Sequence, residues 1–247
     1  MNRWVGKVAI VTGASAGIGA VLAEKLVKEG LQVVGLARRK EPIEILSKKL
    51  DGEKGKLHAL KVDLTKPEEI INAFKWVKEN LGPVHILVNN AGIALNTTLS
   101  DGDYEKWKQV LDVNVLGLSV ATREAVRQMK ENKIDGHIVH INSMLGHRVI
   151  KLPLNMYYAS KYAVTALTEA LLNEFNEEKL KIKITSVSPG VVKTDFRKAA
   201  GYVPQDVVED IPGVTAEEVA DVVIYVLGTP PTVQIRELTL TAVGEIV

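Results

Sequence analysis

The chain of 247 residues has no cysteine. This absence excludes disulfide bonds, catalysis by a thiolate and metal binding by cysteine, and it is compatible with a reducing compartment. Neither sign of charge is in excess, because 31 Lys and Arg are balanced by 30 Asp and Glu, which gives a formal net charge of +1. The charges are mixed along the chain and form no basic stripe, so no nucleic acid is expected as a partner.

The sequence also has no run of about 18 unbroken apolar residues, the length that a membrane span needs. The first six residues lack the apolar core of a signal peptide and lead directly into a strand-like segment. We therefore expect a cytoplasmic protein without a membrane span, and we predict no metal site. The length suits one α/β domain, and no linker, repeat or low-complexity stretch divides it.

Short β-branched runs alternate with amphipathic helical segments along the whole chain. Such alternation is typical of a single doubly wound (Rossmann-type) α/β domain with a seven-stranded parallel sheet. In such a sheet the ligand crevice lies beyond the carboxyl ends of the strands. The predicted strands are 8–12, 31–36, 57–62, 85–89, 137–142, 183–188 and 237–240, and the predicted helices are 18–29, 68–80, 104–131, 157–178 and 216–227.

A glycine-rich turn, spaced GxxxGxG, joins the first strand to the first helix. Glycines let the backbone turn sharply and approach a ligand, and the helix N-terminus behind them offers free N–H groups to a pyrophosphate. The lysine of a nucleoside triphosphate-binding loop is absent, which disfavours triphosphate chemistry. The turn is predicted to bind a dinucleotide, with a purely structural turn as the alternative. Its predicted contact residues are Gly13, Ser15, Gly17, Ile18 and Gly19.

The residues that end the second strand bear on the type of dinucleotide. An acidic residue at this position holds the 2′-hydroxyl of the adenosine ribose, whereas an arginine accommodates a 2′-phosphate. Here Arg38 and Arg39 follow the strand, and no acidic residue occurs before Glu41. The sequence therefore favours NADP(H) as the cofactor, and two solvated arginines are the alternative interpretation.

Polar and small residues follow the third and fourth strands. The carboxylate of Asp63 is placed to accept a hydrogen bond from an adenine amino group, although initiation of the next helix by Asp63 or Thr65 is an alternative. After the fourth strand, asparagines can bridge backbone groups of adjacent strands, and a small Ala-Gly pair leaves room for a ribose. The predicted cofactor contacts here are Asp63, Leu64, Asn90, Ala91 and Gly92.

Tyr157 and Lys161 lie four residues apart at the start of a predicted helix, so both side chains point to one face. A free tyrosine has a pKa near 10 and is a poor acid or base at neutral pH, but a nearby ammonium favours the phenolate. Lowering the pKa by roughly three units requires about 4 kcal/mol of differential stabilisation. Tyr158 has Tyr162 four positions on instead of a basic residue, so Tyr157 is the better candidate.

Ser143 directly follows the fifth strand, at the expected crevice. Without an adjacent base it is a poor nucleophile, but its hydroxyl can donate a hydrogen bond to a carbonyl oxygen. Asn114 falls inside a predicted helix, where asparagine is intrinsically unfavourable. It is expected either to satisfy a local break in the backbone or to hold a water molecule. His140 is expected only to pack within its strand.

Together these residues resemble the short-chain dehydrogenase/reductase family over nearly the whole chain. The resemblance implies that residues 1–247 form one dinucleotide-binding and catalytic domain, with Tyr157 as general acid/base and Ser143 orienting the substrate oxygen. It further implies that Lys161 lowers the pKa of Tyr157 and binds the nicotinamide ribose, and that Asn114 holds a water in a proton relay. Tyr157 and Lys161 are thus also cofactor contacts. The shared stretches are residues 12–19 (TGASAGIG), Asn89-Asn90-Ala91-Gly92, Asn114, Ser143, Tyr157 with Lys161, and 189–194 (PGVVKT), of which Pro189, Gly190, Val192 and Thr194 would contact the nicotinamide end.

Within the family, several stretches are similar to the branch that contains insect NADP-dependent farnesol dehydrogenases and vertebrate dehydrogenase/reductase member eleven. The resemblance implies an NADP-dependent oxidoreductase acting on CH–OH groups, with an isoprenoid alcohol such as farnesol favoured and reduction of steroids or other carbonyl compounds as the alternative. It also implies a homodimer or homotetramer packed through residues 106–131 and 157–178. The similar stretches are 1–4, 34–39, 143–149, 161–168 and 225–230.

Mostly apolar side chains are expected to border the substrate, which suits an apolar alcohol or ketone, although several of them could merely cover the sheet edge. The irregular stretch 195–214 is expected to close over bound ligand. An epimerase or dehydratase with the same Tyr and Lys is disfavoured because no further sugar-binding region follows the seventh strand. A non-catalytic NADP(H)-binding regulator is disfavoured because both reacting residues are present. The predicted substrate contacts are Ser143, Leu145, Val149, Tyr157, Phe196 and Tyr202, with Leu152 and Leu154 nearby.

Overall fold

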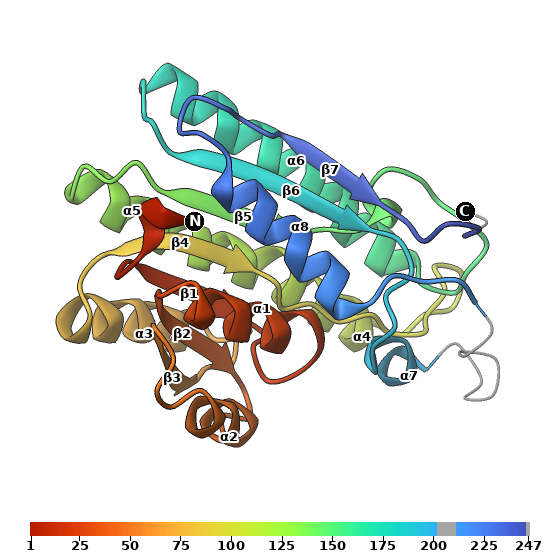
Figure 1. The fold of residues 1–247 in the computed structure, drawn as a ribbon. Helices are drawn as coiled ribbons and strands as arrows, with labels where there is room; N and C mark the ends of the chain where they lie inside the picture. Colours follow the sequence, from red (N-terminus) through yellow and green to blue (C-terminus); the bar gives the residue numbers. More distant parts are fainter. Residues whose placement is uncertain (202–210, 246–247) are drawn as a thin grey trace.

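The computed structural model describes residues 1–201 and 211–245. Its centre is a seven-stranded sheet in the order β3-β2-β1-β4-β5-β6-β7, and each neighbouring pair is parallel (Figure 1). The predicted doubly wound fold is therefore confirmed, and each predicted strand agrees with the structure to within one residue at either end. The strands are β1 (Val8–Thr12), β2 (Gln32–Ala37), β3 (Lys56–Lys61), β4 (Val84–Asn89), β5 (His137–Ile141), β6 (Lys183–Pro189) and β7 (Glu237–Leu240).

Helices cover both faces of the sheet and make two hydrophobic cores. Helices α1 and α8 pack side by side on one face together with α2, while α3, α5 and α6 cover the other (Figure 1). The inner strands are buried on both faces, which explains why they are apolar throughout instead of alternating. The helix bounds are α1 (Gly17–Lys28), α2 (Glu41–Lys49), α3 (Pro67–Asn80), α4 (Tyr104–Leu111), α5 (Leu118–Glu131), α6 (Asn155–Glu177), α7 (Phe196–Ala200) and α8 (Ala216–Gly228).

The strand order reverses between β1 and β4, which follow one another in the sheet but not in the chain. The connection from β1 leads to one face and that from β4 to the other, so a crevice opens beyond their carboxyl ends. In Figure 1 the strand arrows end on one side, where α4, α7 and the start of α1 also lie. The fold therefore directs the loops after the strands to a common edge.

The prediction of one continuous helix over residues 104–131 is wrong. Helix α4 ends at Leu111, a π-helical segment runs from Asp112 to Gly117, and α5 begins at Leu118. Two tertiary contacts are made from this π-helical segment. The Asn114 side chain bonds the backbone of Ile93, and a Cβ on Gly117 would lie only 2.6 Å from the carbonyl oxygen of Leu64. The apolar periodicity of the sequence does not record this break.

Among the described residues, two short α-helices and the 3-10 helices Asn2–Trp4 and Met144–Gly146 were not predicted. Helix α2 turns Ile43 and Leu46 toward the core, but it has only nine residues and so gives a short periodic signal. Helix α7 occupies the beginning of the stretch predicted as irregular, residues 195–214. The rest of that stretch includes residues 202–210, so Tyr202 and the predicted loop closure lie outside the described residues.

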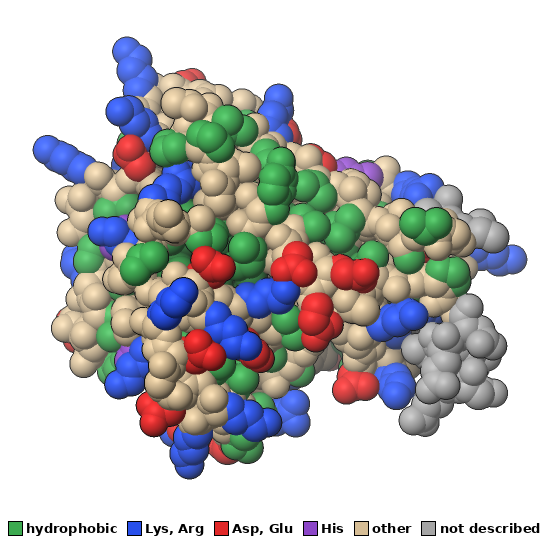
Figure 2. Space-filling model, viewed as in Figure 1, with side chains coloured by type: hydrophobic (Ala, Val, Ile, Leu, Met, Phe, Trp, Pro, Cys, Tyr) green, Lys and Arg blue, Asp and Glu red, His purple; other side chains and the backbone are tan. Residues whose placement is uncertain are grey.

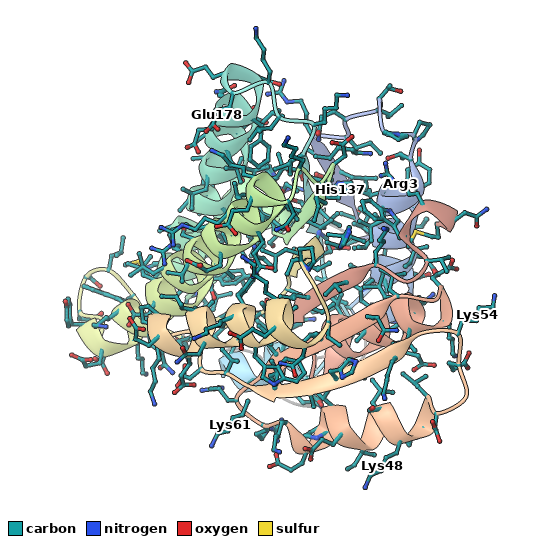
Figure 3. The ribbon with its side chains drawn as sticks, turned by 90° about the vertical axis from the view of Figure 1, so that its left-hand side faces the viewer. Arg3, Lys48, Lys54, Lys61, His137 and Glu178 are labelled. Carbon is teal, nitrogen blue, oxygen red and sulfur yellow. The ribbon has the colours of Figure 1, made fainter. Side chains whose placement is uncertain are left out.

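The amino end of the sheet is closed by the first residues of the chain. The indole Nε1 of Trp4 and the guanidinium of Arg3 both donate to the carbonyl oxygen of Leu227, at 2.8 and 3.3 Å. Lys183 donates to the Thr229 hydroxyl at 2.6 Å. These donors satisfy groups at the C-terminus of α8, where positive charge is favourable. Figure 3 views this end of the sheet, with Arg3 and the buried His137 close together.

The surface carries charges of both signs. On the face drawn in Figure 2, Lys and Arg side chains alternate with Asp and Glu, and apolar side chains lie between them. Within residues 1–201 and 211–245, no helix is both long and apolar enough to cross a membrane.

Candidate active site

The predicted site residues gather where the strands end. Because all seven strands are parallel, the segments that follow β1 to β6 meet at one edge of the sheet. The structure places the predicted residues after β1 (Gly13, Ser15, Gly17, Ile18, Gly19), β2 (Arg38, Arg39), β3 (Asp63, Leu64), β4 (Asn90, Ala91, Gly92) and β5 (Ser143, Leu145), and at the end of β6 and beyond it (Pro189, Gly190, Val192, Thr194).

The glycine turn has a conformation that other residues would strain. Gly13 and Gly17 have φ angles of +68° and +55°, in the left-handed region that favours glycine. A Cβ on Gly19 would lie 2.4 Å from the carbonyl oxygen of Gly13, so the helix could not approach the turn. The N-cap residue Ala16 makes no side-chain cap, which leaves the first N–H groups of α1 available to an anion. The turn therefore fits the pyrophosphate of a dinucleotide.

Thr12 and Asn90 lock the turn to the segment after β4. The Thr12 hydroxyl accepts hydrogen bonds from the N–H groups of Asn90 and Ala91, both at 3.0 Å. In return the Asn90 side chain donates to the carbonyl oxygens of Thr12 and Gly13, at 2.9 and 3.3 Å. This is the bridging between adjacent strands that the sequence predicts, and it fixes the floor of the crevice.

The adenine end of the predicted site contains two exposed arginines and a carboxylate. Arg38 and Arg39 are exposed just beyond β2. Although partial desolvation opposes the shift, hydrogen bonds from Thr65 and the positive charges of Arg38 and Lys66 lower the pKa of Asp63. The Asp63 carboxylate accepts from both the N–H and the hydroxyl of Thr65, at 3.0 and 2.8 Å. Asp63 therefore organises the turn before α3, in agreement with its interpretation as a helix-initiating residue. Its contact with adenine stays a prediction.

Tyr157 and Lys161 occupy the first turns of α6, which begins at Asn155. Both are buried, and the Lys161 Nζ lies 5.7 Å from the centre of the Tyr157 ring. This ammonium donates to the carbonyl oxygen of Ile141 at 2.8 Å. Burial lowers the pKa of Lys161 to about 8, so the amine is mainly charged at neutral pH. A positive charge at this distance in a buried site stabilises a phenolate.

Ser143 is held against α6 by a network around its turn. Its hydroxyl oxygen accepts from the Leu145 N–H at 3.1 Å. The neighbouring Asn142 side chain donates to the Thr165 hydroxyl at 2.9 Å, and that hydroxyl donates to the carbonyl oxygen of Gly146 at 3.1 Å. A Cβ on Gly146 would lie 2.8 Å from the carbonyl oxygen of Lys161, so only glycine permits this close approach. The turn and the helix therefore hold Ser143 and Tyr157 in fixed relation.

Asn114 connects the π-helical segment to the same helix. Its Oδ1 accepts from the Ile93 N–H, and its Nδ2 donates to the Ile93 carbonyl oxygen, both at 2.8 Å. The Nδ2 also donates to the Ser160 hydroxyl at 3.0 Å, and Ser160 donates to the carbonyl oxygen of Tyr157 at 2.7 Å. Asn114 therefore bonds the backbone of Ile93, 21 residues away in the chain, and the two roles expected for it both stay predictions. The position of Gly92 lies between this asparagine and Lys161, since a Cβ there would be 3.5 Å from Asn114 Oδ1 and 3.9 Å from the Lys161 Nζ.

The segment after β6 is fixed by a carboxylate from the end of the described chain. Glu245 accepts hydrogen bonds from the N–H groups of Val191 and Ala242, at 2.8 and 3.0 Å. A Cβ on Gly190 would lie 2.3 Å from this carboxylate. Further on, Thr194 lies beside the glycine turn, because a Cβ on Gly17 would be 3.4 Å from its methyl group.

A small apolar cluster lies beside Tyr157. The Phe196 ring is 5.8 Å from the Tyr157 ring, centre to centre, and Leu145 packs against the same cluster. Val149 does not join them, because it is 67% exposed. The cluster consists of Ala94, Leu154, Tyr157, Tyr158 and Ala200, with Leu145, Ile150, Leu152 and Phe196 packed against it.

His140 is buried one strand position from Ile141 and makes more than strand packing. Its Nδ1 lies 3.0 Å from the Thr168 hydroxyl and its Nε2 lies 3.4 Å from the Thr122 hydroxyl. Burial, with a smaller effect of the Lys161 charge, lowers the pKa of His140 to about 3. The imidazole is therefore neutral at physiological pH and has no acid-base role there.

Sequence reasoning missed several residues that position the site. Thr12 and Ser160 carry hydroxyls whose partners are far away in the chain, and no local pattern distinguishes them from other buried hydroxyls. Glu245 reaches back more than fifty residues to Val191. The sequence predicts which residues contact the site, but only the fold determines which groups form hydrogen bonds with one another.

Comparisons with known proteins agree with this geometry. Residues 7–202 match the model of the family described as short chain dehydrogenase. The farnesol dehydrogenase of Aedes aegypti is 48% identical over 99% of this chain and 99% of its own length. The human dehydrogenase/reductase SDR family member 11 is 44% identical over 97% of this chain and 95% of its own length.

Solved structures show the same architecture. A serine dehydrogenase in its closed form, complexed with NADP⁺, superposes with a TM-score of 0.89 at 26% sequence identity. The match covers 97% of this chain and 96% of that one. The whole described fold, and not the dinucleotide-binding half alone, is therefore shared.

Proposed function

Since the chain belongs to the short-chain dehydrogenase family and is an oxidoreductase of alcohols and carbonyl compounds, we propose that it transfers a hydride between NADP(H) and an apolar alcohol or its aldehyde or ketone. The observation that carries the proposal is the burial of the Lys161 ammonium 5.7 Å from the centre of the Tyr157 ring. No ion pair of Lys161 is found within residues 1–201 and 211–245, and a buried amine without a carboxylate is costly. Its position beside a phenol gives it a chemical use.

In the proposed mechanism, Tyr157 is the general acid for reduction and the general base for oxidation. Its phenol gives a proton to the carbonyl oxygen, or takes one from the alcohol, while hydride moves at the adjacent carbon. The nicotinamide, when bound, supplies or accepts that hydride. Lys161 stabilises the phenolate by electrostatics, and this effect is larger than in water because both side chains are buried.

Ser143 and Asn114 support that step in different ways. The Ser143 hydroxyl, fixed by its turn, is proposed to donate a hydrogen bond to the substrate oxygen and to orient it toward Tyr157. Asn114 holds Ile93 and Ser160 and so fixes the start of α6 relative to the floor of the crevice. The family resemblance assigns Asn114 a water in a proton relay, and this role stays a proposal.

NADP(H) is proposed as the cofactor in preference to NAD(H). The glycine turn fits a pyrophosphate, and the exposed guanidinium groups of Arg38 and Arg39 follow β2, where a 2′-phosphate is bound in doubly wound domains. The related serine dehydrogenase structure is a complex with NADP⁺, which supports the same preference. The proposed contacts are the glycine turn, Arg38, Arg39, Asp63, Leu64, residues 90–92, Tyr157, Lys161 and the segment from Pro189 to Thr194.

The substrate is proposed to be an apolar alcohol, with an isoprenoid alcohol such as farnesol favoured. The apolar cluster around Tyr157 supports this class, and the Aedes relative is named for farnesol. Reduction of steroids or other carbonyl compounds is the second candidate, since other similar relatives have names that specify no substrate. Among the predicted contacts, Leu145 and Phe196 support the proposal, whereas the exposed Val149 does not.

A turnover assay tests the proposal. Purified protein is incubated with NADP⁺ or NADPH and with farnesol, geraniol or a panel of steroids, and absorbance at 340 nm is followed. Turnover of the isoprenoid alcohols above that of the steroids is the expected result. Firm binding of NADPH with no turnover of any compound would contradict an enzymatic function and would favour a regulator that only binds the cofactor.

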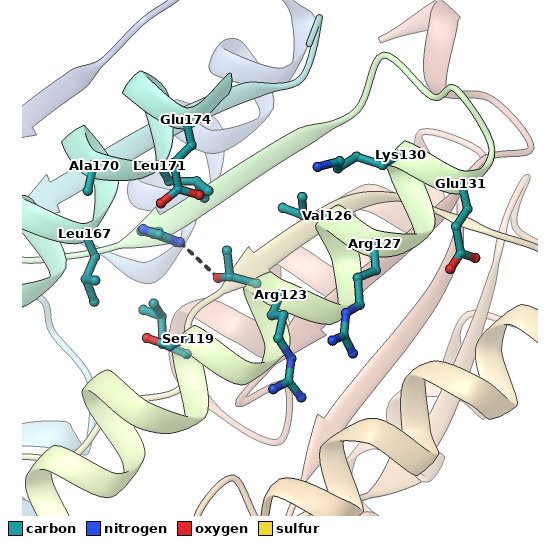
Figure 4. Close-up of a pocket in the computed structure, with 13 residues that line it drawn as sticks. Ser119, Arg123, Val126, Arg127, Lys130, Glu131, Leu167, Ala170, Leu171 and Glu174 are labelled. Carbon is teal, nitrogen blue, oxygen red and sulfur yellow. Dashed lines mark hydrogen bonds between the residues drawn. The ribbon is translucent and has the colours of Figure 1, made fainter. Parts of the chain in front are cut away.

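Self-association through α5 and α6 is also proposed. A groove of about 470 Å³ runs between these helices, with apolar walls that include Val126, Leu167 and Leu171 (Figure 4). Its rim carries charges of both signs, with Glu131 beside the cations of α5 and Glu174 on α6 (Figure 4). The cations are already paired, Arg123 and Arg127 with Glu124 and Lys130 with Glu178. A two-fold axis would bring the apolar walls of this groove in one copy against the same walls in the other. Light scattering on the wild type and on Leu171→Arg tests it, because a charge in the groove should yield monomers.

A cytoplasmic location is the last part of the proposal. The absence of cysteine is compatible with a reducing compartment but is not specific to it. Fractionation of cells that produce the tagged chain tests the location, and recovery of the protein with membranes or in the medium would contradict it.

A further inference from the structure

Arg197, on the helix α7, is buried without a hydrogen-bonding partner at its Nε atom. The residue is only 9% exposed. The Nε is shielded from solvent and has no hydrogen-bond partner among residues 1–201 and 211–245. The carboxylate nearest in the chain, Asp195, is exposed and lies 3.8 Å from the Lys198 ammonium. The helix thus turns one cation toward solvent and another toward the protein interior.

The position of α7 relates this guanidinium to the active site. Phe196, the preceding residue, contacts the Tyr157 ring, and Ala200, three residues on, packs in the apolar cluster around it. The N–H of Asn96 donates to the Ala200 carbonyl oxygen at 3.1 Å, which holds the helix in place. Residues three apart lie on one side of a helix, so Arg197 faces the same side as Ala200.

The other end of the segment reaches the glycine turn. Thr194, three residues before Arg197, lies beside Gly17, which begins α1. The stretch from Thr194 to Ala200 therefore extends from the proposed pyrophosphate site to the residues that surround Tyr157. Arg197 lies in the middle of this stretch, on a helix fixed at both ends.

A guanidinium stays charged at all physiological pH values, and its burial without a partner opposes folding. Buried polar groups in proteins almost always have partners, and an exception needs an explanation. An arginine also presents planar N–H groups whose geometry matches the two oxygens of a carboxylate or a phosphate. A ligand oxyanion would satisfy these donors where the protein leaves one unsatisfied.

We propose that Arg197 is an anion-binding residue that receives an oxyanion of the bound ligand on the inner side of α7. The proposal rests on the proposed function, because that function brings the diphosphate of a dinucleotide into the crevice, whereas a carboxylated substrate would replace the apolar class proposed above. Two sources of the same chemistry fit this position, namely the diphosphate of the dinucleotide and a carboxylate carried by the substrate. In either case Arg197 couples the position of α7 to the presence of ligand.

The test compares Arg197→Met with the control Lys198→Met. Both variants remove one positive charge from the same helix, but Lys198 is exposed. Binding of NADPH is measured by fluorescence titration, and kcat/KM is measured for 4-carboxybenzaldehyde and for 4-methylbenzaldehyde. A diphosphate partner predicts NADPH binding about tenfold to a hundredfold weaker in Arg197→Met. A carboxylate partner predicts unchanged NADPH binding and a similar loss of the preference for the carboxylated aldehyde.

Thermal unfolding without ligand separates a binding role from a structural one. Since the Nε makes no bond within the protein, Arg197→Met is expected to unfold at the wild-type temperature or above it. The proposal is overturned if the variant binds NADPH and discriminates between the two aldehydes as the wild type does, whatever its stability. NADPH binding can be measured even if no alcohol or aldehyde is turned over. Failure of the proposed function is therefore recognised separately, by the turnover assay of the wild type.

Discussion

The side chain of Asn114 donates a 3.0 Å hydrogen bond to the hydroxyl of Ser160, which donates in turn to the carbonyl oxygen of Tyr157 at 2.7 Å. This pair joins the π-helical segment to the first turn of α6. Within this segment Asn114 also donates to the carbonyl oxygen of Ile93. π-helical turns of this kind occur often at functional sites.

Ser160→Ala is expected to lower the free energy of unfolding by about 1 kcal/mol, because a buried hydroxyl loses its bonds to both partners. Turnover should fall as well, with KM little changed, since Tyr157 loses part of its support. Ser119→Ala is the control, because that hydroxyl also donates to a helix carbonyl, at 2.8 Å, but lies away from Tyr157. Urea denaturation and kinetics at 340 nm measure both effects. If Ser160→Ala and Ser119→Ala have equal turnover, the hydrogen bond between Asn114 and Ser160 only stabilises the fold.

Tyr157→Phe is expected to reduce kcat by at least about a hundredfold, because general acid-base catalysis contributes factors of that order. Binding of NADPH should remain. Tyr158→Phe is the matched control. It removes a hydroxyl that donates to the Ile150 carbonyl oxygen at 2.7 Å, and it should cost stability without a comparable loss of turnover. Wild-type turnover in Tyr157→Phe would disprove the mechanism.

The pKa of Lys161 predicts a pH-dependent stability. Below pH 8 the amine is charged in the folded and the unfolded chain, and the folded state alone bears the cost of burying the charge. As the pH rises from about 8 toward 10.5, the folded state releases its proton first, and that cost disappears. The wild type should therefore gain up to about 3 kcal/mol of stability relative to Lys161→Met across this window.

Denaturation of both chains by urea at pH 7 and pH 10 measures this difference. Lys183, whose pKa is lowered to about 8 by burial and to a smaller extent by the charge of Arg3, is present in both chains, so its contribution cancels. A constant difference between the two chains at both pH values would mean that Lys161 titrates as an exposed lysine.

Arg38→Asp is expected to shift the cofactor preference from NADP toward NAD. A carboxylate at this position would repel a 2′-phosphate and accept a hydrogen bond from a 2′-hydroxyl. The ratio of kcat/KM for the two cofactors is the measurement, and Lys48→Asp, an equal change of charge on the exposed side of α2, is the control. If the ratio moves equally in both variants, Arg38 does not read the phosphate.

Glu245→Ala is expected to raise the KM for NADPH about fivefold to tenfold, because the segment from Pro189 to Thr194 loses a fixed contact at Val191. The KM for the alcohol should change less. Glu245→Gln can retain one of the two bonds and should lie between Ala and the wild type. A uniform fall in kcat with no change in either KM would show that the carboxylate only stabilises the fold.

The sequence by itself determined the layers of the fold and the types of residue at the site. Buried parallel strands need apolar side chains on both faces, so β1 and β5 are visible as uninterrupted apolar runs. Glycines in the left-handed region, and a tyrosine four positions before a lysine, are local features. Because the strands are parallel, the residues after them were expected at one edge, and the structure confirms that they meet there.

The tertiary structure alone decided which groups become partners. Asn114 bonds Ile93, and Glu245 holds Val191, although each pair is far apart in the chain. The absence of a partner for the Arg197 Nε among the described residues is visible only after the chain is packed. A hydrogen bond links atoms that the fold brings together from distant positions, whereas periodicity reports only which side of an element is buried. For that reason the sequence indicated the chemistry of the site, and the fold decided its connections.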